Sequence, residues 1–261
     1  MAFTLESFSL AGKVAVVTGA GARGASIGRA YALGLAGVGA AVVVGDINGD
    51  GAKGVAAEVV AAGGRAIGVQ VDITDEASVA AMAQAAREAF GGVDILVNNA
   101  ALMVELKRSL ILDVEIDDWN RLFAVNLTGA LICCKAFAPM MRERGGGRIV
   151  NQVSAGAYPP LRPYGITKLA LVGLTTSLAR ELGKDNINVN AIAPGATQSE
   201  AGQALSQPGS PFSNMIEATA AIRPKGQPED LVGALLLLCS PAGSWMTGQV
   251  IHVDGGWIIK V

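Results

Sequence analysis

Residues 13–28 read Lys-Val-Ala-Val-Val-Thr-Gly-Ala-Gly-Ala-Arg-Gly-Ala-Ser-Ile-Gly, an apolar run that passes into a glycine-rich turn. The run 13–18 is typical of a short buried strand, and a helical pattern extends from Arg29 to about Gly37. Glycines let the backbone approach a pyrophosphate closely, and a helix N-terminus offers free N–H groups and a positive dipole end. Strand, glycine turn and helix in this order predict a dinucleotide-binding unit.

An acidic residue stands where such a unit needs one. A second apolar strand, 41–45, ends at Asp46, about twenty residues beyond the turn, where a carboxylate accepts hydrogen bonds from both ribose hydroxyls of an adenosine. Asp46 indicates NAD, because its charge repels the 2′-phosphate of NADP. Arg23 in the glycine turn competes with this effect, since its positive charge partly offsets the repulsion. The alternative is a glycine-rich turn followed by an Asp that caps a helix.

The rest of the chain alternates short apolar runs with helical patterns. Repeated strand–helix units require right-handed crossovers and a parallel sheet. The sequence therefore predicts an α/β fold, with a single domain over 1–261 and a Rossmann-type doubly wound parallel sheet of about seven strands flanked by helices. We place strands near 13–18, 41–45, 66–71, 94–98, 147–152, 187–192 and 249–253, and the clearest helices at 76–90, 118–142, 164–183 and 229–239.

Candidate site residues follow five of these strands. They are Asp46, Asp72, Asn99, Ser154 and Pro194. Ligands of parallel sheets bind at the carboxyl ends of the strands. We therefore expect these residues to converge on one crevice, although they are far apart in the sequence.

Tyr164 and Lys168 are four positions apart in a helical pattern, so their side chains project from one face of the helix. A free phenol has a pKa of about 10, and a neighbouring ammonium favours the phenolate. We expect Lys168 to lower the pKa of Tyr164 toward neutrality and the pair to act as general acid or base. Taken alone, a Tyr and a Lys at this spacing are more often a buried ring beside a solvated charge.

These motifs together resemble those of the short-chain dehydrogenase/reductase family over essentially the whole chain. Besides the glycine turn and the Tyr164/Lys168 pair, the matching elements are Asp72, Asn98-Asn99-Ala100-Ala101, Asn126 in Asn-Leu-Thr-Gly, Asn151-Gln152-Val153-Ser154, Pro194-Gly195 and Val253-Asp254-Gly255-Gly256. Three features differ from the family's usual pattern. The glycine turn is longer, with Ser26 at the place of the middle glycine; the interval from Ser154 to Tyr164 is shorter; and Ala101 replaces a glycine.

The resemblance implies which residues act. Tyr164 is expected to be the base in oxidation and the acid in reduction, with Lys168 stabilising its phenolate and binding the nicotinamide ribose. Ser154 is expected to polarise the substrate oxygen, and Asn126 to hold a water that links Lys168 to solvent. The expected cofactor-binding residues are Gly19, Arg23, Ser26, Ile27, Gly28, Asp46, Ile47, Asp72, Ile73, Asn99, Ala100, Tyr164, Lys168, Pro194, Gly195 and Thr197.

The implied activity is that of an NAD-dependent oxidoreductase that interconverts a secondary alcohol and a ketone, with NADP the less favoured cofactor. Residues expected near the nicotinamide are largely apolar, with no basic clamp for a carboxylate: Met103, Ala155, Tyr158, Phe212 and Met215. A neutral, lipophilic substrate fits best. A 3-oxoacyl thioester carried by acyl carrier protein or CoA is the alternative.

Two further features concern the substrate and the assembly. The segment 197–223 is too irregular for one long helix yet contains apolar residues, so we expect a substrate lid. The segments 120–138 and 164–180 are apolar beyond one helix stripe and need a second surface to cover them. The resemblance implies a homotetramer formed through these helices.

Two other functional classes fit less well. Enoyl-thioester reductases of the same superfamily have a similar long glycine turn, but they place Tyr and Lys further apart than the four positions found here. A non-catalytic dinucleotide sensor would keep the glycine turn and Asp46 without the reacting groups, whereas Asn126, Ser154, Tyr164 and Lys168 are all present.

Composition narrows the remaining choices. A net charge of −2 with mixed signs gives no basic patch for nucleic acid. The longest stretch without Asp, Glu, Lys or Arg, 231–253, is interrupted by a loop and predicts no membrane span, and no signal peptide is apparent, so we expect a cytoplasmic protein. The three cysteines and the lone His252 lie in apolar segments, so we expect core and strand residues rather than metal ligands.

Overall fold

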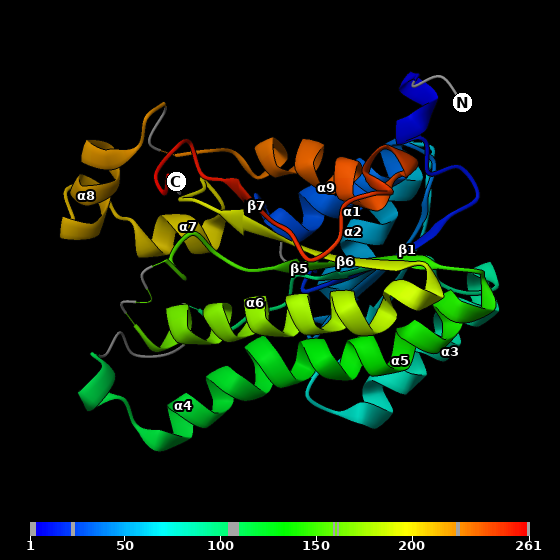
Figure 1. Cartoon of the computed structure of the whole chain (residues 1–261), viewed down its shortest axis with the longest axis horizontal. Helices are drawn as coiled ribbons and strands as arrows, with labels where there is room; N and C mark the ends of the chain where they lie inside the picture. The colour runs from blue at the N-terminus through cyan, green and yellow to red at the C-terminus, as the bar shows by residue number, and fades with distance from the viewer. Residues whose placement is uncertain are drawn as a thin grey trace.

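The computed structural model describes residues 4–21, 24–103, 110–158, 160, 162–222 and 225–259. Within them, seven strands pair in parallel in the order β3-β2-β1-β4-β5-β6-β7 (Figure 1). They are β1 (Val14–Thr18), β2 (Ala41–Asp46), β3 (Arg65–Gln70), β4 (Ile95–Asn98), β5 (Gly147–Gln152), β6 (Ile187–Pro194) and β7 (Val250–Val253). The predicted doubly wound sheet is confirmed. Its order reverses between β1 and β4, the switch point where such sheets bind ligands.

Helices cover both faces of the sheet. The six covering helices are α1 (Ile27–Gly37), α2 (Gly49–Ala61), α3 (Glu76–Phe90), α5 (Ala130–Glu143), α6 (Pro163–Leu182) and α9 (Val232–Cys239), and short 3-10 helices lie at Leu5–Phe8, Ile111–Asp113, Gly183–Asp185, Pro228–Leu231 and Pro241–Gly243. Side chains of a strand alternate between faces. Val14 and Val16 of β1 therefore pack with α3, α5 and α6, while Ala15 and Val17 pack with α1, α2 and α9 (Figure 1). All three cysteines are free and buried, as predicted.

The helix predicted at 118–142 begins earlier and contains a π-helical segment. It consists of α4 (Ile116–Phe123), a π-helix (Ala124–Gly129) and α5. Gly129 lies so close to Ile73 that a Cβ there would come within 2.7 Å of the isoleucine Cδ1. π-helical turns are frequent at functional sites, and this one contains the buried Asn126.

The same run is the one helix in the described ranges that is long and apolar enough to cross a membrane. The mean hydropathy is 1.5 in its most apolar window, and half of that window is buried inside the protein. Phe137 and Met141 of α5 are completely buried in the core. Packing against the sheet therefore accounts for the apolar character of this helix.

The predicted irregular segment 197–223 contains two short helices, α7 (Glu200–Leu205) and α8 (Pro211–Thr219). Ser199 and Ser210 are their N-caps, and each side-chain oxygen accepts a hydrogen bond from a backbone N–H of the first turn. The two helices lie beyond the carboxyl end of β6, beside the C-terminal segment (Figure 1). We expect α7 and α8 to form the substrate lid.

Candidate active site

Two buried polar side chains join the carboxyl ends of β1 and β4. Thr18 Oγ1 accepts hydrogen bonds from the backbone N–H groups of Asn99 and Ala100, at 3.1 and 3.2 Å. Asn99 Nδ2 donates to the backbone oxygens of Thr18 and Gly19, at 2.9 and 2.8 Å. These bonds bring Gly19, Asn99 and Ala100 together at the switch point of the sheet.

Two glycines of the turn are required by close contacts. Gly19 has a φ of +65°, and a Cβ there would come within 2.5 Å of the Ala100 Cα. A Cβ on Gly28 would come within 2.5 Å of the Gly19 carbonyl oxygen. Larger residues at these positions would separate the turn from α1 or from β4.

Helix α1 begins directly after the turn. Ser26 is its N-cap, and Ser26 Oγ accepts a hydrogen bond from the Arg29 N–H at 3.2 Å. Ile27 and Gly28 are the first two helical residues, whose N–H groups have no acceptor within the helix. The first turn of α1 is therefore suited to an anion. Arg23 lies outside the described residues.

The carboxylate of Asp46 faces the glycine turn. Its Oδ2 accepts from the Gly21 N–H at 2.8 Å and its Oδ1 from the Asn48 N–H at 2.9 Å. A carboxylate has about four lone-pair sites, so acceptor capacity remains for ribose hydroxyls. The alternative that Asp46 caps a helix is wrong, because Asn48 is the N-cap of α2. The neighbouring Ile47 is 66% exposed, so its side chain is accessible to a ligand.

Asp72 and Ile73 follow β3 at the same edge. The Asp72 N–H donates to Ser78 Oγ at 3.0 Å, and Asp72 Oδ1 accepts from both the N–H and the hydroxyl of Thr74. Ile73 is only 7% exposed and packs against Gly129. The Ile73 side chain therefore belongs to the core, which leaves its backbone for the expected contact with a cofactor.

Ser154 and Tyr164 form a hydrogen-bonded pair. The Ser154 side chain bonds to the Tyr164 hydroxyl, and Ser154 Oγ also accepts from the Gly156 N–H at 3.0 Å. Ser154 follows β5, whereas Tyr164 lies in the first turn of α6. The structure thus brings together two of the predicted catalytic residues.

A tight turn accommodates the short interval between them. The N–H groups of Ala157 and Tyr158 donate to the carbonyls of Ser154 and Ala155, at 3.0 and 2.9 Å. Ala157 also forms an isolated antiparallel bridge with Pro160. These contacts show how the shortened interval is spanned in its described residues; Pro159 and Leu161 lie outside them.

Lys168 is buried beside the Tyr164 ring. Its Nζ lies 5.6 Å from the ring centroid and donates to the Gln152 carbonyl at 2.8 Å. Burial lowers the pKa of Lys168 to about 7 and raises the pKa of Tyr164, against the smaller lowering effect of the Ser154 hydrogen bond. The prediction that Lys168 lowers the Tyr164 pKa toward neutrality is wrong. The cost of desolvating the Tyr164 phenolate outweighs the attraction of the Lys168 charge, because a buried amine with a pKa of about 7 is only partly charged at neutral pH.

Asn126 connects the π-helix to α6. Its Oδ1 accepts from the Leu102 N–H at 2.8 Å, and its Nδ2 donates to the Leu102 carbonyl at 3.1 Å and to Thr167 Oγ1 at 3.0 Å. Thr167 Oγ1 in turn donates to the Tyr164 carbonyl at 2.7 Å. Both Nδ2 protons are used, so the amide keeps one Oδ1 lone pair for the expected water.

The segment after β6 lies beside the Ser154 loop. The Pro194 carbonyl accepts from the Ala155 N–H at 2.9 Å. Gly195 follows, and Thr197 is 6% exposed, with its hydroxyl 2.8 Å from that of Ser199. The predicted residues Pro194, Gly195 and Thr197 are thus near the catalytic pair, although the Thr197 side chain is mostly engaged within its own loop.

Sequence reasoning missed a buried polar chain that links β4, β5 and α6. Asn98 Nδ2 donates to Asn151 Oδ1 at 2.9 Å, and Asn151 Nδ2 donates to Thr175 Oγ1 at 3.0 Å. The two asparagines are paired in register. Asn at the ends of two otherwise apolar strands was the signal available. These hydrogen bonds hold α6 against the sheet and so fix the positions of Tyr164 and Lys168.

Aromatic side chains gather on the expected substrate side. The Phe212 ring of α8 meets the Trp257 ring edge-on, with centroids 5.9 Å apart. The Tyr158 ring lies 5.4 Å from that of His252, which is a β7 residue as predicted. Ala155 was expected to face the nicotinamide, but it is completely buried, because its loop packs against the end of β6.

The donors and acceptors fit a nicotinamide dinucleotide. The first turn of α1 offers N–H groups for a diphosphate, and Asp46 offers acceptors for a ribose. Lys168 Nζ has three protons and one hydrogen-bond acceptor in the described part of the chain, which leaves donors for a second ribose. In the same residues, no group of three or more His, Cys, Asp or Glu side chains is placed to hold a metal ion.

Comparison with known proteins gives the same family throughout. A family model described as "Enoyl-(Acyl carrier protein) reductase" matches residues 21–258. An uncharacterized oxidoreductase of Mycobacterium tuberculosis is 50% identical over 248 residues, which are 95% of this chain and 98% of that protein. The 7alpha-hydroxysteroid dehydrogenase of Escherichia coli is 38% identical over 98% of both chains. A 3-oxoacyl-[acyl-carrier-protein] reductase of Synechocystis is 34% identical over 96% of this chain and 99% of that one.

Solved structures agree. A 7alpha-hydroxysteroid dehydrogenase complexed with NADH and 7-oxo glycochenodeoxycholic acid superposes with a TM-score of 0.90 at 36% identity, over 99% of both chains. A putative NAD(P)-dependent gluconate 5-dehydrogenase of Beutenbergia cavernae with bound NADP at low occupancy gives 0.87 at 38% identity, over 96% of this chain and 98% of that one. The chain belongs to the short-chain dehydrogenase/reductase family of oxidoreductases.

Proposed function

We propose that this oxidoreductase is an NAD-dependent dehydrogenase that interconverts a secondary alcohol and a ketone on a neutral, lipophilic substrate. The observation that carries the proposal is the hydrogen-bonded pair of Ser154 and Tyr164 beside the buried amine of Lys168. These three groups suit a reaction in which one proton moves to or from an oxygen. The supporting comparison is the 7alpha-hydroxysteroid dehydrogenase relative.

Each of these residues has a separate role in the proposed reaction. Ser154 donates a hydrogen bond to the substrate oxygen where negative charge develops. Tyr164, kept protonated by burial, gives its proton to that oxygen in reduction and takes it back in oxidation. Lys168 holds the proton that compensates a phenolate, and a pKa of about 7 lets it gain or lose that proton near neutral pH. A nicotinamide dinucleotide supplies or accepts the hydride when bound.

Asp46 supports NAD as the cofactor. Both its oxygens already accept backbone N–H groups, so the carboxylate is fixed in place beside the glycine turn. A fixed negative charge favours a ribose with two free hydroxyls over a 2′-phosphate. The solved relatives contain NADH in one case and NADP in another, so the choice rests on this residue.

Apolar and aromatic side chains support a lipophilic substrate. Phe212 and Trp257 pair between α8 and the C-terminal segment, and Phe212 is 38% exposed. A lid of this character favours a hydrocarbon skeleton over a polyol. A 3-oxoacyl thioester is the second candidate, which the Synechocystis relative supports.

A homotetramer formed through α4, α5 and α6 is part of the proposal. Ile116, Leu131 and Leu169 on these helices are 68%, 37% and 39% exposed. Apolar residues on adjacent helices outside the core are the kind of surface that a second copy covers.

A substrate panel tests the proposal. The purified protein is given NADH with a 7-oxosteroid, a 3-oxoacyl-CoA and an enoyl-CoA, and oxidation is followed at the reduced-nicotinamide absorbance band. We expect turnover of the steroid to exceed that of either thioester. Faster reduction of the 3-oxoacyl-CoA selects the second candidate, and reduction of the enoyl-CoA alone refutes both. Tyr164→Phe gives the non-enzymatic background.

A further inference from the structure

The C-terminal segment 254–259 is in direct contact with the segment expected to form the lid. It runs beside α7 and α8, beyond the carboxyl end of β6 (Figure 1). The N–H groups of Ala221 and Ile222, at the end of the expected lid, both donate to the Gly255 carbonyl, at 2.9 and 3.0 Å. A Cβ on Gly256 would come within 2.7 Å of the Ala221 Cβ. The backbones of the two segments therefore pack closely together.

The C-terminal segment begins with a turn that is fixed by its own hydrogen bonds. Asp254 Oδ1 accepts from the Gly256 N–H at 3.0 Å, and Asp254 Oδ2 accepts from the Ile258 N–H at 2.9 Å. The Val253 carbonyl just before the turn accepts from the Gly195 N–H at 3.1 Å. The turn is therefore anchored to the carboxyl ends of β6 and β7.

Trp257 is the side chain through which this turn contacts α8. Phe212 is the second residue of α8, and its ring meets the indole of Trp257 edge-on at 80°, with centroids 5.9 Å apart. Edge-to-face aromatic pairs favour this arrangement. Phe212 remains 38% exposed, so part of its ring is accessible to a ligand.

Helix α7 is held by other contacts. The N–H of its first residue, Glu200, donates to the Ala25 carbonyl in the glycine turn at 2.9 Å, and beyond its last residue the Ser206 carbonyl accepts from Lys225 Nζ at 2.7 Å. The link from α7 to α8 passes through Gly209, which has a φ of +77° and no atom of the described residues within 4 Å of its Cβ position. This link does not fix α8. The contacts of α8 itself therefore set its position.

We propose that Trp257 is a positioning residue that holds α8 at the substrate side of the crevice through Phe212, and so sets the affinity for a lipophilic substrate. The inference rests on the proposed function, because it assigns α8 to the substrate of that reaction. Trp257 covers one part of the Phe212 ring and leaves the exposed part for the substrate. Without the indole, α8 loses this contact and its position is less well defined.

Steady-state kinetics test the proposal with the substrate of the panel that the wild type turns over best. Trp257→Ala should raise KM about 3- to 10-fold, which corresponds to the loss of one aromatic pair. We expect kcat and the dissociation constant of NADH to stay within about twofold of the wild type, because the contact contributes to binding and not to the chemical step. Trp257→Phe keeps a ring and should restore most of the affinity.

A double-mutant cycle shows whether the two aromatic residues act together. Phe212→Ala removes both the contact with Trp257 and the ring offered to the substrate, so it should raise KM at least as much as Trp257→Ala. The double variant should match Phe212→Ala, because Trp257 acts through Phe212. Additive effects would show that the two side chains act independently, which overturns the proposal.

Hydrogen–deuterium exchange provides a readout that does not depend on turnover. With saturating NADH, the amides of α8 should exchange about 3- to 10-fold faster in Trp257→Ala than in the wild type. The amides of α7 should exchange at the wild-type rate, because its contacts with Ala25 and Lys225 remain. If the wild type turns over no substrate of the panel, the proposed function fails, and the exchange rates alone decide whether Trp257 holds α8.

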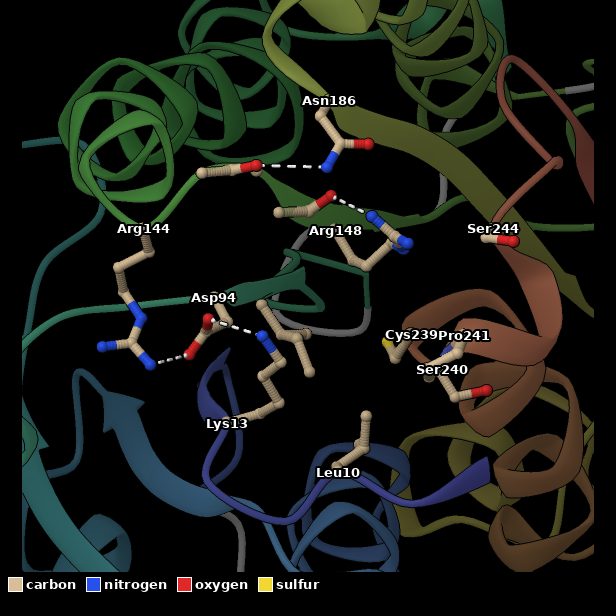
Figure 2. A pocket seen from close by; sticks show the side chains of 14 residues that line it. Leu10, Lys13, Asp94, Arg144, Arg148, Asn186, Cys239, Ser240, Pro241 and Ser244 are labelled. Carbon is tan, nitrogen blue, oxygen red and sulfur yellow. Dashed lines mark hydrogen bonds and ion pairs between the residues drawn. The ribbon is translucent and has the colours of Figure 1, made fainter. Parts of the chain in front are cut away.

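Two controls separate positioning from the loss of an indole and from the loss of stability. Trp245 is 99% exposed and precedes β7, so Trp245→Ala removes an indole at a distance from α8. Arg144→Gln breaks the 2.9 Å ion pair with the buried Asp94, which Lys13 also contacts, beside a cavity at the amino-terminal edge of the sheet (Figure 2). Arg144→Gln should lower the unfolding temperature. Both controls should leave KM and the exchange of α8 at the wild-type values.

The proposal requires a change in both measurements when a substrate is turned over. An unchanged KM or an unchanged exchange of α8 in folded Trp257→Ala overturns it, and so does a lower kcat at the wild-type KM. Equal changes in Arg144→Gln assign the effect to stability and overturn it as well. If Trp257→Ala does not fold, Trp257→Leu decides by the same criteria, because it removes the ring and keeps apolar volume.

Discussion

Lys168 Nζ lies 5.6 Å from the centroid of the Tyr164 ring, and the Gln152 carbonyl at the end of β5 holds it there. The two residues have opposite responses to burial. The pKa of Lys168 falls to about 7, whereas the pKa of Tyr164 rises. At neutral pH the phenol is therefore protonated, and the amine is the group that changes charge.

Tyr164→Phe removes the reacting hydroxyl and little else. We expect turnover to fall by at least about 10²- to 10⁴-fold, the usual contribution of general acid–base catalysis. NADH binding, measured by fluorescence titration, should remain close to that of the wild type because the ring and Lys168 stay in place. Tyr31→Phe is the control, because Tyr31 is buried in the core away from the reacting groups, and it should keep most of the activity. A Tyr164→Phe enzyme with more than about half of the wild-type rate rules out this assignment.

Ser154→Ala removes two contributions at once. Loss of the hydrogen bond to the substrate oxygen should lower kcat by about 10²- to 10³-fold. The Ser154 bond also lowers the pKa of Tyr164, so its loss should move the pH profile of alcohol oxidation to higher pH. Ser154→Thr keeps the hydroxyl and should restore the position of the profile. An unshifted profile in Ser154→Ala contradicts the proposed pairing.

The buried amine of Lys168 makes the free energy of unfolding depend on pH. Its pKa is about 7 in the folded protein and about 10.4 in an unfolded chain, so between these values the unfolded state binds more protons. Stability contributed at this site therefore rises with pH through that window, and below it the full cost of a buried charge applies.

Lys168→Met removes this dependence. The free energy of unfolding of the wild type relative to Lys168→Met should increase between about pH 7 and 10, by up to about 1.4 kcal/mol per pH unit. Urea unfolding over this range measures it. Tyr164→Phe keeps the amine and should retain the wild-type slope. A difference that does not change with pH would mean that Lys168 is charged and balanced in the folded protein.

The sheet was predictable because each strand is an apolar run followed by a turn or by a polar residue. Helix α2 is less evident, since Gly49, Gly51 and Gly54 weaken its pattern. Gly51 packs directly on the carbonyl of Gly21 in the glycine turn, a tertiary contact that no local pattern shows. The π-helix around Asn126 was missed for a similar reason, because one extra residue in a turn hardly changes the helical periodicity.

The catalytic residues were predictable from type and spacing, but their charge states were not. Spacing places Tyr164 and Lys168 on one helix face, which the structure confirms. Desolvation depends on β5 and the loop after it, which cover Lys168 to 1% exposure.

The proposed assembly depends on apolar residues outside the core. Leu131 of α5 and Leu169 of α6 are 37% and 39% exposed, and the two helices lie side by side (Figure 1). Light scattering should give the mass of a tetramer for the wild type. A double variant, Leu131→Glu with Leu169→Glu, should yield a smaller species. Val60→Glu is the control, since Val60 is 53% exposed on α2, on the other face of the sheet. A monomeric wild type with full activity refutes the tetramer.

Asp46 should determine the choice of cofactor. Its carboxylate is held by the N–H groups of Gly21 and Asn48, so it cannot turn away from a 2′-phosphate without breaking both bonds. Two like charges in a partly desolvated crevice repel more strongly than in water. We expect the wild type to use NAD with a much higher kcat/KM than NADP. Asp46→Ser removes the ribose bonds and the repulsion together, so NAD efficiency should fall while NADP efficiency rises or holds.

Asp72→Ser is the control for this prediction. Asp72 also follows a strand at this edge but carries no predicted role in discrimination, so its replacement should leave the ratio of the two efficiencies near the wild-type value. Arg23→Ala separates the competing effect: if that guanidinium pairs with a phosphate, its removal should lower only the NADP efficiency. Equal or better use of NADP by the unmutated enzyme would show that the charge of Asp46 does not control the choice.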